Sequence, residues 1–152
     1  QFDCGNPVID KFVRASLKKS VRNSDCAAKA LIDRQSGELI GICTFTAYSL
    51  EKQRVSGVLQ GSQPSEIGVV RLVMLGVARK YQKRGFGQDL LCDFFEHVKI
   101  IHQALPIKGV YLDADPAAIN FYARLGFVQL SATPNAFGAV PMFLAIQHIL
   151  AA

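Results

Sequence analysis

A short segment with two glycines and several basic residues is the part of this sequence best suited to bind an anion. Residues 79–87 read Arg-Lys-Tyr-Gln-Lys-Arg-Gly-Phe-Gly, and apolar residues at helical spacing follow. A helix beginning there would offer unpaired backbone N–H groups and the positive end of the peptide dipoles. Gly85 and Gly87 would let a phosphate come close, while Lys83 and Arg84 add charge. The segment therefore predicts a phosphate-binding loop.

Two common phosphate loops have a different spacing. A P-loop carries Lys followed by Ser or Thr after its last glycine, whereas Gly87 is followed by Gln88 and Asp89. A dinucleotide-binding loop needs a third glycine where Leu90 stands, and its strand directly precedes the glycines. Both the nucleotide-triphosphate enzymes and the dinucleotide-binding fold are therefore disfavoured.

The hydrophobic periodicity predicts the elements that must position this loop. Gly76, within an apolar strand, suggests a bulge or a close backbone approach. The order of elements favours an α/β fold of the α+β type in a single domain, 1–152. The predicted elements are a helix over 6–22, strands over 27–33 and 39–48, a long loop over 49–66, a strand over 67–78, a helix from the loop to about His102, a strand over 110–114, a helix over 116–125, and strands over 127–130 and 141–147.

The first predicted helix carries a stripe of positive charge, and it has no Glu partner at four-residue spacing. The net charge of the chain is +5 and its pI is near 9.2, which favours a polyanionic partner or an anionic cofactor. Such a stripe is either a solvated helix face or a surface that meets phosphates, and both interpretations remain open. Its residues are Lys11, Arg14, Lys18, Lys19 and Arg22, with Arg54 on the long loop as a weaker candidate.

Composition limits the class of protein. Of the 152 residues, 50% are hydrophobic and 19% charged, which excludes a disordered chain. No apolar stretch approaches the roughly 20 residues that span a bilayer, so no membrane segment is expected. The cysteines form no C-x-x-C pair and have no His cluster nearby, which favours reduced thiols in a cytoplasmic protein and argues against a bound metal. Because the first residue is Gln1 rather than Met, we expect the natural start to be missing.

Two motifs resemble signatures of the GNAT family of acyl-CoA-dependent N-acetyltransferases. The pattern Gln82-x-x-Gly85-x-Gly87 looks like the pyrophosphate-binding motif of that family, and residues 120–127, Asn-Phe-Tyr-Ala-Arg-Leu-Gly-Phe, are similar to its second signature. The resemblance implies a single GNAT-like domain. Its sheet would be mixed and mostly antiparallel, with a splayed central strand and flanking helices. Acetyl-CoA would be the acetyl donor, and coenzyme A the product.

The resemblance also assigns roles to residues of this sequence. Tyr122 would lie beside the thioester sulfur and protonate the departing thiolate, which a phenol with a pKa of about 10 can do at neutral pH. The backbone of the central strand would hydrogen-bond the pantetheine amides. The residues implied in cofactor binding are Leu75, Gly76, Val77, Gln82, Lys83, Arg84, Gly85, Phe86, Gly87, Gln88 and Asn120.

The N-terminal residues suggest a narrower group within the family. Residues 2–13, which begin Phe-Asp-Cys-Gly, resemble the opening of the GNAT toxins of toxin–antitoxin pairs, of the TacT and AtaT type. That resemblance implies acetylation of the α-amino group on aminoacyl-tRNA, a block of translation, a ribbon-helix-helix antitoxin and a homodimer. The toxins commonly read Gly-Arg-Leu-Ala-Val-Asp in the central strand, whereas residues 73–78 lack both the Arg and the Asp.

The acid–base chemistry agrees with that substrate. No Glu or His lies within the central strand, where the nearest acid is Glu66 before it. An α-amino group, with a pKa of about 7.7–8.0, is already partly neutral at physiological pH and needs only a weak base. Two alternatives remain: a housekeeping acetyltransferase of a small amine or a protein N-terminus, and a non-catalytic module that binds RNA or a partner.

Overall fold

A computed structural model describes the whole chain, residues 1–152, as two compact units. Unit 1 comprises residues 1–46 and 72–97, and unit 2 comprises residues 47–71 and 98–152. Two strands and the longest helix of the chain continue from one unit into the other. Each unit is described by itself below.

Unit 1 begins with helix α1 (Pro7–Ala15), which starts as the sequence predicts. The side chain of Asn6 accepts hydrogen bonds from the backbone N–H groups of Val8 and Ile9, and Pro7 occupies the first turn. The apolar face of the helix packs against a core that includes Phe2 and Tyr81. The amphipathic pattern therefore identifies the buried face correctly.

The prediction of one helix over 6–22 is wrong, because the chain breaks at Ser16. With φ of −125° and ψ of −20°, this residue leaves the helical region, and helix α2 (Leu17–Arg22) begins after it. Serine is a weak helix former, since its side chain competes for backbone hydrogen bonds. The predicted basic stripe is consequently divided between two short helices.

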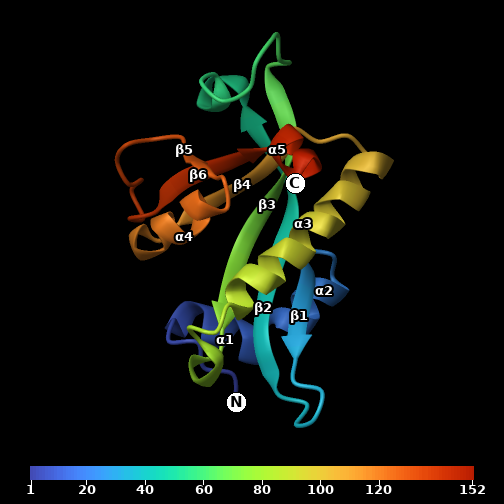
Figure 1. Cartoon of the computed structure of the whole chain (residues 1–152), viewed down its shortest axis with the longest axis vertical. Coiled ribbons are helices and arrows are strands. Elements are labelled where there is room, and N and C mark those ends of the chain that lie inside the picture. Colours follow the sequence, from blue (N-terminus) through green and yellow to red (C-terminus); the bar gives the residue numbers. More distant parts are fainter. The chain divides into compact units, whose positions relative to one another are not determined.

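A hairpin forms the sheet of unit 1, where β1 (Ala27–Ile32) pairs antiparallel with β2 (Leu39–Glu51). The carboxylate of Asp33 accepts backbone hydrogen bonds from the predicted turn, and Gly37 has the positive φ of 74° that the turn requires. These N–H groups hold the pKa of Asp33 below its usual value. The hairpin prediction is confirmed (Figure 1).

Strand β3 (Glu66–Val77) leads through the 3-10 turn η2 (Arg79–Tyr81) into helix α3 (Phe86–Ala104). A Cβ at Gly76 would lie 3.1 Å from Cγ2 of Ile9 and 3.2 Å from Sγ of Cys4. The atoms that crowd this glycine belong to side chains of α1 and of the N-terminal segment, not to another backbone, so the expected bulge or close backbone approach stays a prediction. These side-chain contacts explain why the small residue is needed within the strand.

In unit 2, β4 (Gly109–Ala114) pairs antiparallel with β6 (Val140–Ala145), which also pairs with the short β5 (Val128–Gln129). The start of β3 pairs parallel with β4, where Val70 lies opposite Val110. Between β4 and β5 the chain forms the 3-10 turn η3 (Pro116–Ala118) and helix α4 (Ile119–Arg124). The core includes Leu50, Val69 and Phe143.

Two predicted elements of unit 2 need correction. Strand β2 continues to Glu51 and the 3-10 turn η1 (Lys52–Val55) follows, so the predicted loop over 49–66 is partly ordered structure. The buried side chains of Leu50 and Val55 anchor this stretch in the core. The last strand ends at Ala145 rather than residue 147, and helix α5 (Ile146–Ala151) completes the chain.

The strands form one sheet of six in the order β1-β2-β3-β4-β6-β5. Three of the pairings are antiparallel and that of β3 with β4 is parallel, so the mixed, mostly antiparallel sheet is confirmed. The splay of the central strand beyond Arg71 stays a prediction. None of the helices has the length and apolar character needed to cross a bilayer.

Candidate functional site

The glycine loop of unit 1 presents a row of unused backbone donors. The N–H of Gln82 donates to Arg79 O and that of Asp89 to Gly85 O, at 3.2 and 3.0 Å. The N–H groups between them, from Lys83 to Gln88, donate to no group within the protein. They occupy the loop and the first turn of α3, where the peptide dipoles add positive potential. This arrangement suits a diphosphate.

Two residues of the loop have left-handed backbones. Gly85 has φ of 83°, with open space where a Cβ would stand, and Lys83 has φ of 64°. Such alternation turns successive N–H groups toward one side and forms a concave anion site. The sequence places a glycine at one of these positions but a lysine at the other, so the strain at Lys83 could not be foreseen.

Both ends of the loop are anchored on an aromatic pair. The rings of Tyr81 and Phe86 meet edge to face, with centroids 6.1 Å apart, and the Tyr81 hydroxyl donates to Asp33 at 3.2 Å. The Arg84 guanidinium lies 5.6 Å from the centre of the Tyr81 ring. The supporting role of Tyr81 cannot be predicted from the sequence, because Asp33 is distant in the chain.

The side chain of Gln82 holds the loop rather than pointing freely outward. Its amide nitrogen donates to the carbonyls of Cys4 and Val77, at 2.9 and 2.8 Å. The Gln82 side chain thus ties the loop to the N-terminal segment and to the end of β3. Val77 O accepts one of these bonds, and the pantetheine contact implied for residues 75–77 stays a prediction.

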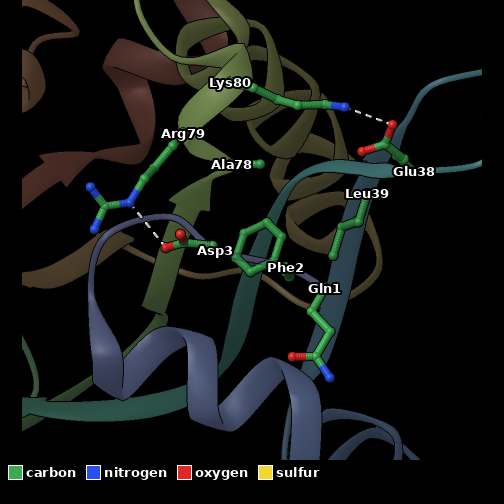
Figure 2. A pocket seen from close by; sticks show the side chains of 8 residues that line it. All are labelled: Gln1, Phe2, Asp3, Glu38, Leu39, Ala78, Arg79 and Lys80. Carbon is green, nitrogen blue, oxygen red and sulfur yellow. Dashed lines mark hydrogen bonds and ion pairs between the residues drawn. The ribbon is translucent and has the colours of Figure 1, made fainter.

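The basic residues before the loop are paired with acids. Nε of Arg79 lies 3.1 Å from Asp3, and Nζ of Lys80 lies 2.7 Å from Glu38. Figure 2 shows both pairs at a cavity of about 320 Å³ that is also lined by Gln1, Phe2, Leu39 and Ala78. Lys83 and Arg84 therefore remain as the loop cations available to a phosphate.

The predicted catalytic tyrosine lies in unit 2. Tyr122 is buried in α4, and its ring meets Phe121 and Phe127 edge to face at 5.2 and 5.6 Å. Its carbonyl accepts the N–H groups of Leu125 and Phe127 as the helix ends. Aromatic packing on two sides fixes the direction of the ring. Asn120, predicted to contact the cofactor, is exposed on the same helix.

The glycine of the second motif is demanded by its surroundings. Gly126 has φ of 105°, which side chains rarely adopt, and a Cβ there would lie 2.9 Å from Cδ2 of His148 on α5. Glycine is therefore needed in this motif because α4 ends there and α5 packs against its end. The position of His148 could not be foreseen from the sequence, which predicts a strand over 141–147 and no helix after it.

The predicted basic stripe loses one member to a structural role. Nε and Nη2 of Arg14 donate to Phe2 O at 3.0 and 2.6 Å. Asp10, on the same helix, accepts the Cys4 N–H at 2.8 Å, which keeps the pKa of Asp10 below its usual value. These contacts hold the N-terminal Phe-x-Cys-Gly segment in place. Lys11, Lys18, Lys19 and Arg22 are exposed.

Unit 2 contains a polar network whose central residues, Tyr111, Asp113 and Arg71, were not predicted as site residues. The Tyr111 hydroxyl donates to Asp113 at 2.8 Å and accepts from Arg54 at 2.8 Å, while Arg71 pairs with Asp113 at 3.2 Å. Burial and the Asp113 hydrogen bond raise the pKa of Tyr111. The Tyr48 and Tyr111 rings stack with centroids 5.4 Å apart. Arg54, predicted as a weaker RNA contact, is engaged here.

A second groove of unit 2 lies beside this network. Its volume is about 540 Å³, and one wall is formed by Gln53, Arg54, Ser56, Gly57 and Val58. The other wall is formed by Val128, Gln129 and Leu130. The groove is therefore bounded by η1 and the short edge strand β5.

Known proteins resemble this chain in sequence and structure. A family model described as acetyltransferase (GNAT) domain matches residues 28–129. The tRNA-acetylating toxin of Mycobacterium tuberculosis (strain ATCC 25618 / H37Rv) is 23% identical over 128 residues, which cover 83% of this chain and 75% of that protein. A solved structure of a bacterial toxin is 99% identical, with a TM-score of 0.97, and covers 99% of this chain and 84% of its own.

Solved structures of the toxin AtaT share the fold at lower identity. AtaT complexed with acetyl-methionyl-tRNAfMet is 23% identical, with a TM-score of 0.84, over 99% of this chain and 88% of that chain. A mutant of AtaT bound to the C-terminus of the antitoxin AtaR and acetyl-CoA is 22% identical, with a TM-score of 0.78, over 97% and 85% of the two chains. The resemblance drawn from the motifs is confirmed. Because the family model spans most of its length, this chain belongs to the GNAT family of acetyltransferases.

Proposed function

We propose that this protein is an acetyl-CoA-dependent N-acetyltransferase toxin that acetylates the α-amino group of aminoacyl-tRNA and thereby blocks translation. The observation that carries the proposal is the row of unused N–H groups from Lys83 to Gln88 in a loop of GNAT spacing. The toxin names of its relatives, and the tRNA and acetyl-CoA in the AtaT complexes, support the choice of substrates.

The loop would hold the cofactor through its backbone. The N–H groups of Lys83, Arg84, Gly85, Phe86, Gly87 and Gln88 would donate to the diphosphate of acetyl-CoA, and the side chains of Lys83 and Arg84 would balance its charge. The backbone of Leu75, Gly76 and Val77 would receive the pantetheine arm as an added strand does, and Asn120 would contact the cofactor. Acetyl-CoA supplies the acetyl group as a thioester.

Tyr122 would act as the general acid. When the amine displaces the thiolate, the phenol donates its proton to the departing sulfur and recovers one from solvent. Phe121 and Phe127 keep the ring in one orientation, so its proton is delivered in a fixed direction. An α-amino group is partly neutral at physiological pH, which is consistent with a central strand that carries no Glu or His beyond Glu66 at its start.

The partners follow from this reading. The exposed residues Lys11, Lys18, Lys19 and Arg22 would meet tRNA phosphates, so binding should weaken steeply as salt rises. A small ribbon-helix-helix antitoxin, encoded beside the toxin gene, would neutralise the protein, and we expect a homodimer. A cytoplasmic location follows from the substrate.

Thiol release from acetyl-CoA tests the proposal. Turnover that requires aminoacyl-tRNA, and that stops with uncharged tRNA, is the expected result. Turnover with free amines or peptide N-termini would instead identify a housekeeping acetyltransferase. No turnover with any amine, together with RNA binding, would identify a non-catalytic module.

A further inference from the structure

One aromatic side chain stands almost wholly in solvent. Phe137 is 95% exposed, more than any other large apolar side chain on the surface, among which Leu105 follows at 70%. A phenyl ring in water gains nothing from folding, since its apolar area stays hydrated. The Phe137 ring therefore contributes little to the stability of the monomer and is accessible to a ligand.

Hydrogen bonds within the loop around Phe137 fix its backbone in a tight turn. Oδ1 of Asn135 accepts the N–H groups of Phe137 and Ala139, at 2.9 and 3.0 Å. The backbone of Asn135 also donates to Ala139 O at 2.7 Å and accepts from Gly138 at 2.9 Å, and Gly138 has φ of 79°. These bonds close a tight turn with the ring at its tip.

The surroundings of the ring fit a flat ligand better than a protein surface. Its neighbours in the chain, Ala136 and Gly138, are too small to cover its faces. A stable protein interface buries about 800 Å² on each partner, which one ring cannot supply, whereas a nucleobase needs only one aromatic face. From Leu125 to Ala152 the chain carries no Asp, Glu, Lys or Arg, so no acid near the ring in sequence repels a phosphate.

We propose that Phe137 stacks on an unpaired nucleobase of the tRNA substrate, at its single-stranded acceptor end. This inference rests on the proposed function for the identity of the RNA. Unpaired bases are commonly bound by stacking on aromatic side chains. The exposed cations of α1 and α2 would bind phosphates electrostatically, and Phe137 would bind a base by stacking.

Steady-state kinetics with aminoacyl-tRNA test the role of the ring. Phe137→Ala should raise KM for charged tRNA by about 5- to 150-fold, the range of one base–aromatic stack, and leave KM for acetyl-CoA unchanged. Phe137→Leu should behave like Phe137→Ala, because it keeps apolar volume but lacks the ring. Leu105→Ala is the matched control, since it removes the next most exposed apolar side chain.

Salt dependence separates stacking from phosphate binding. The slope of log affinity against log salt should be the same for Phe137→Ala as for the parent protein, whereas Lys18→Gln should make it shallower by about one counterion. If Phe137→Ala changes the slope of log affinity against log salt, the contact of Phe137 with tRNA is not a stack on a base.

The sequence offers a direct optical test because it contains no Trp. In the Phe137→Trp protein the single indole should be quenched by tRNA, and the same titration should leave a Leu105→Trp protein nearly unchanged. This readout needs no turnover, so a protein that binds RNA but fails to acetylate it would refute the proposed function and still support stacking.

Three results would overturn the inference. Equal KM values for Phe137→Ala and the parent protein would remove its basis. Full activity of Phe137→Leu would show that apolar volume suffices without a stack. A change of oligomeric state in Phe137→Ala, seen by sedimentation, would assign the ring to a second copy of the chain instead.

Discussion

The glycine loop before α3 and the helical turn around Tyr122 present chemistry in opposite ways. The loop offers backbone N–H groups, and its side chains hold it in place: Gln82 binds Cys4 O and Val77 O, and Tyr81 packs on Phe86. The turn offers one side-chain hydroxyl, and its backbone is consumed by the end of the helix. The loop should therefore be sensitive to changes of its backbone, and the turn to the loss of one hydroxyl.

The contrast extends to the two units that contain them. In unit 2, Asp113 joins two other ionisable groups in one network, since it binds both Tyr111 and Arg71. Unit 1 buries the Cys43 thiol without exposure on β2, and this burial raises the pKa of Cys43 to about 11. Four predictions follow from this comparison, in order of decreasing effect.

Removing one oxygen tests the turn. Tyr122→Phe should lower kcat by about 10²- to 10⁴-fold, the usual contribution of a general acid, while affinity for acetyl-CoA and thermal stability change little. Thiol release and calorimetry measure the two quantities. Tyr48→Phe, which removes a hydroxyl from the same unit, should keep kcat within a few-fold; equal losses in both variants would contradict the assigned role.

Breaking the network tests unit 2. Asp113→Ala leaves Arg71 and the Tyr111 hydroxyl without their acceptor and should cost about 2–3 kcal/mol of unfolding free energy, less than a fully buried pair because both side chains are partly exposed. Urea denaturation measures this. Asp113→Asn keeps one acceptor and should lie between Asp113→Ala and the parent. A neutral Asp113→Ala would mean that the network is incidental.

Alkaline pH tests the interior of unit 1. The unfolded Cys43 thiol loses its proton near pH 9.0, while the folded thiol keeps it until about pH 11. The folded state thus binds more protons between these values, so stability is complete below pH 9.0 and falls as pH rises, by roughly 2 kcal/mol near pH 10.5. Cys43→Ala should flatten this fall, and an unchanged slope would exclude Cys43 as its source.

A glycine pair tests the loop backbone. Gly85 and Gly37 both have positive φ and open space at Cβ, but Gly37 lies in the β1–β2 turn. Alanine at either position should cost about 1–2 kcal/mol of stability. Of the two variants, only Gly85→Ala should weaken acetyl-CoA binding, because it turns the N–H groups of the loop away from the diphosphate. A loss of about 1.4 kcal/mol of binding free energy corresponds to about a tenfold higher Kd. Identical acetyl-CoA affinities in both variants would mean that the loop is not the diphosphate site.

The sequence predicts elements that depend on local chemistry. The Asn6–Pro7 start, the turn at Gly37 and the glycine loop are correct because their determinants lie within a few residues. It fails where distant contacts decide. The ordered stretch through Val55 and helix α5 depend on buried side chains, such as Val55 and Ile149, that no local pattern records. The break at Ser16 has a local cause, the weak helix propensity of serine, but the hydrophobic periodicity continues across it.

The same division holds for the candidate site. The spacing of Gln82, Gly85 and Gly87 predicts the loop, since backbone conformation leaves its mark on glycine positions. The supports are invisible in the sequence, because Tyr81 binds Asp33 and Arg71 binds Asp113 over long separations. The network around Tyr111 could have been suspected only from a polar residue alternating with apolar ones on β4.

The contact between Gly126 and His148 constrains natural variation at position 126 more than at position 148. His148 can shrink to a smaller residue without consequence for Gly126, because the backbone angle there still demands glycine. A change at Gly126, by contrast, needs both a new backbone path and the retreat of the imidazole. Among related sequences, diversity should therefore accumulate at position 148 while position 126 stays fixed.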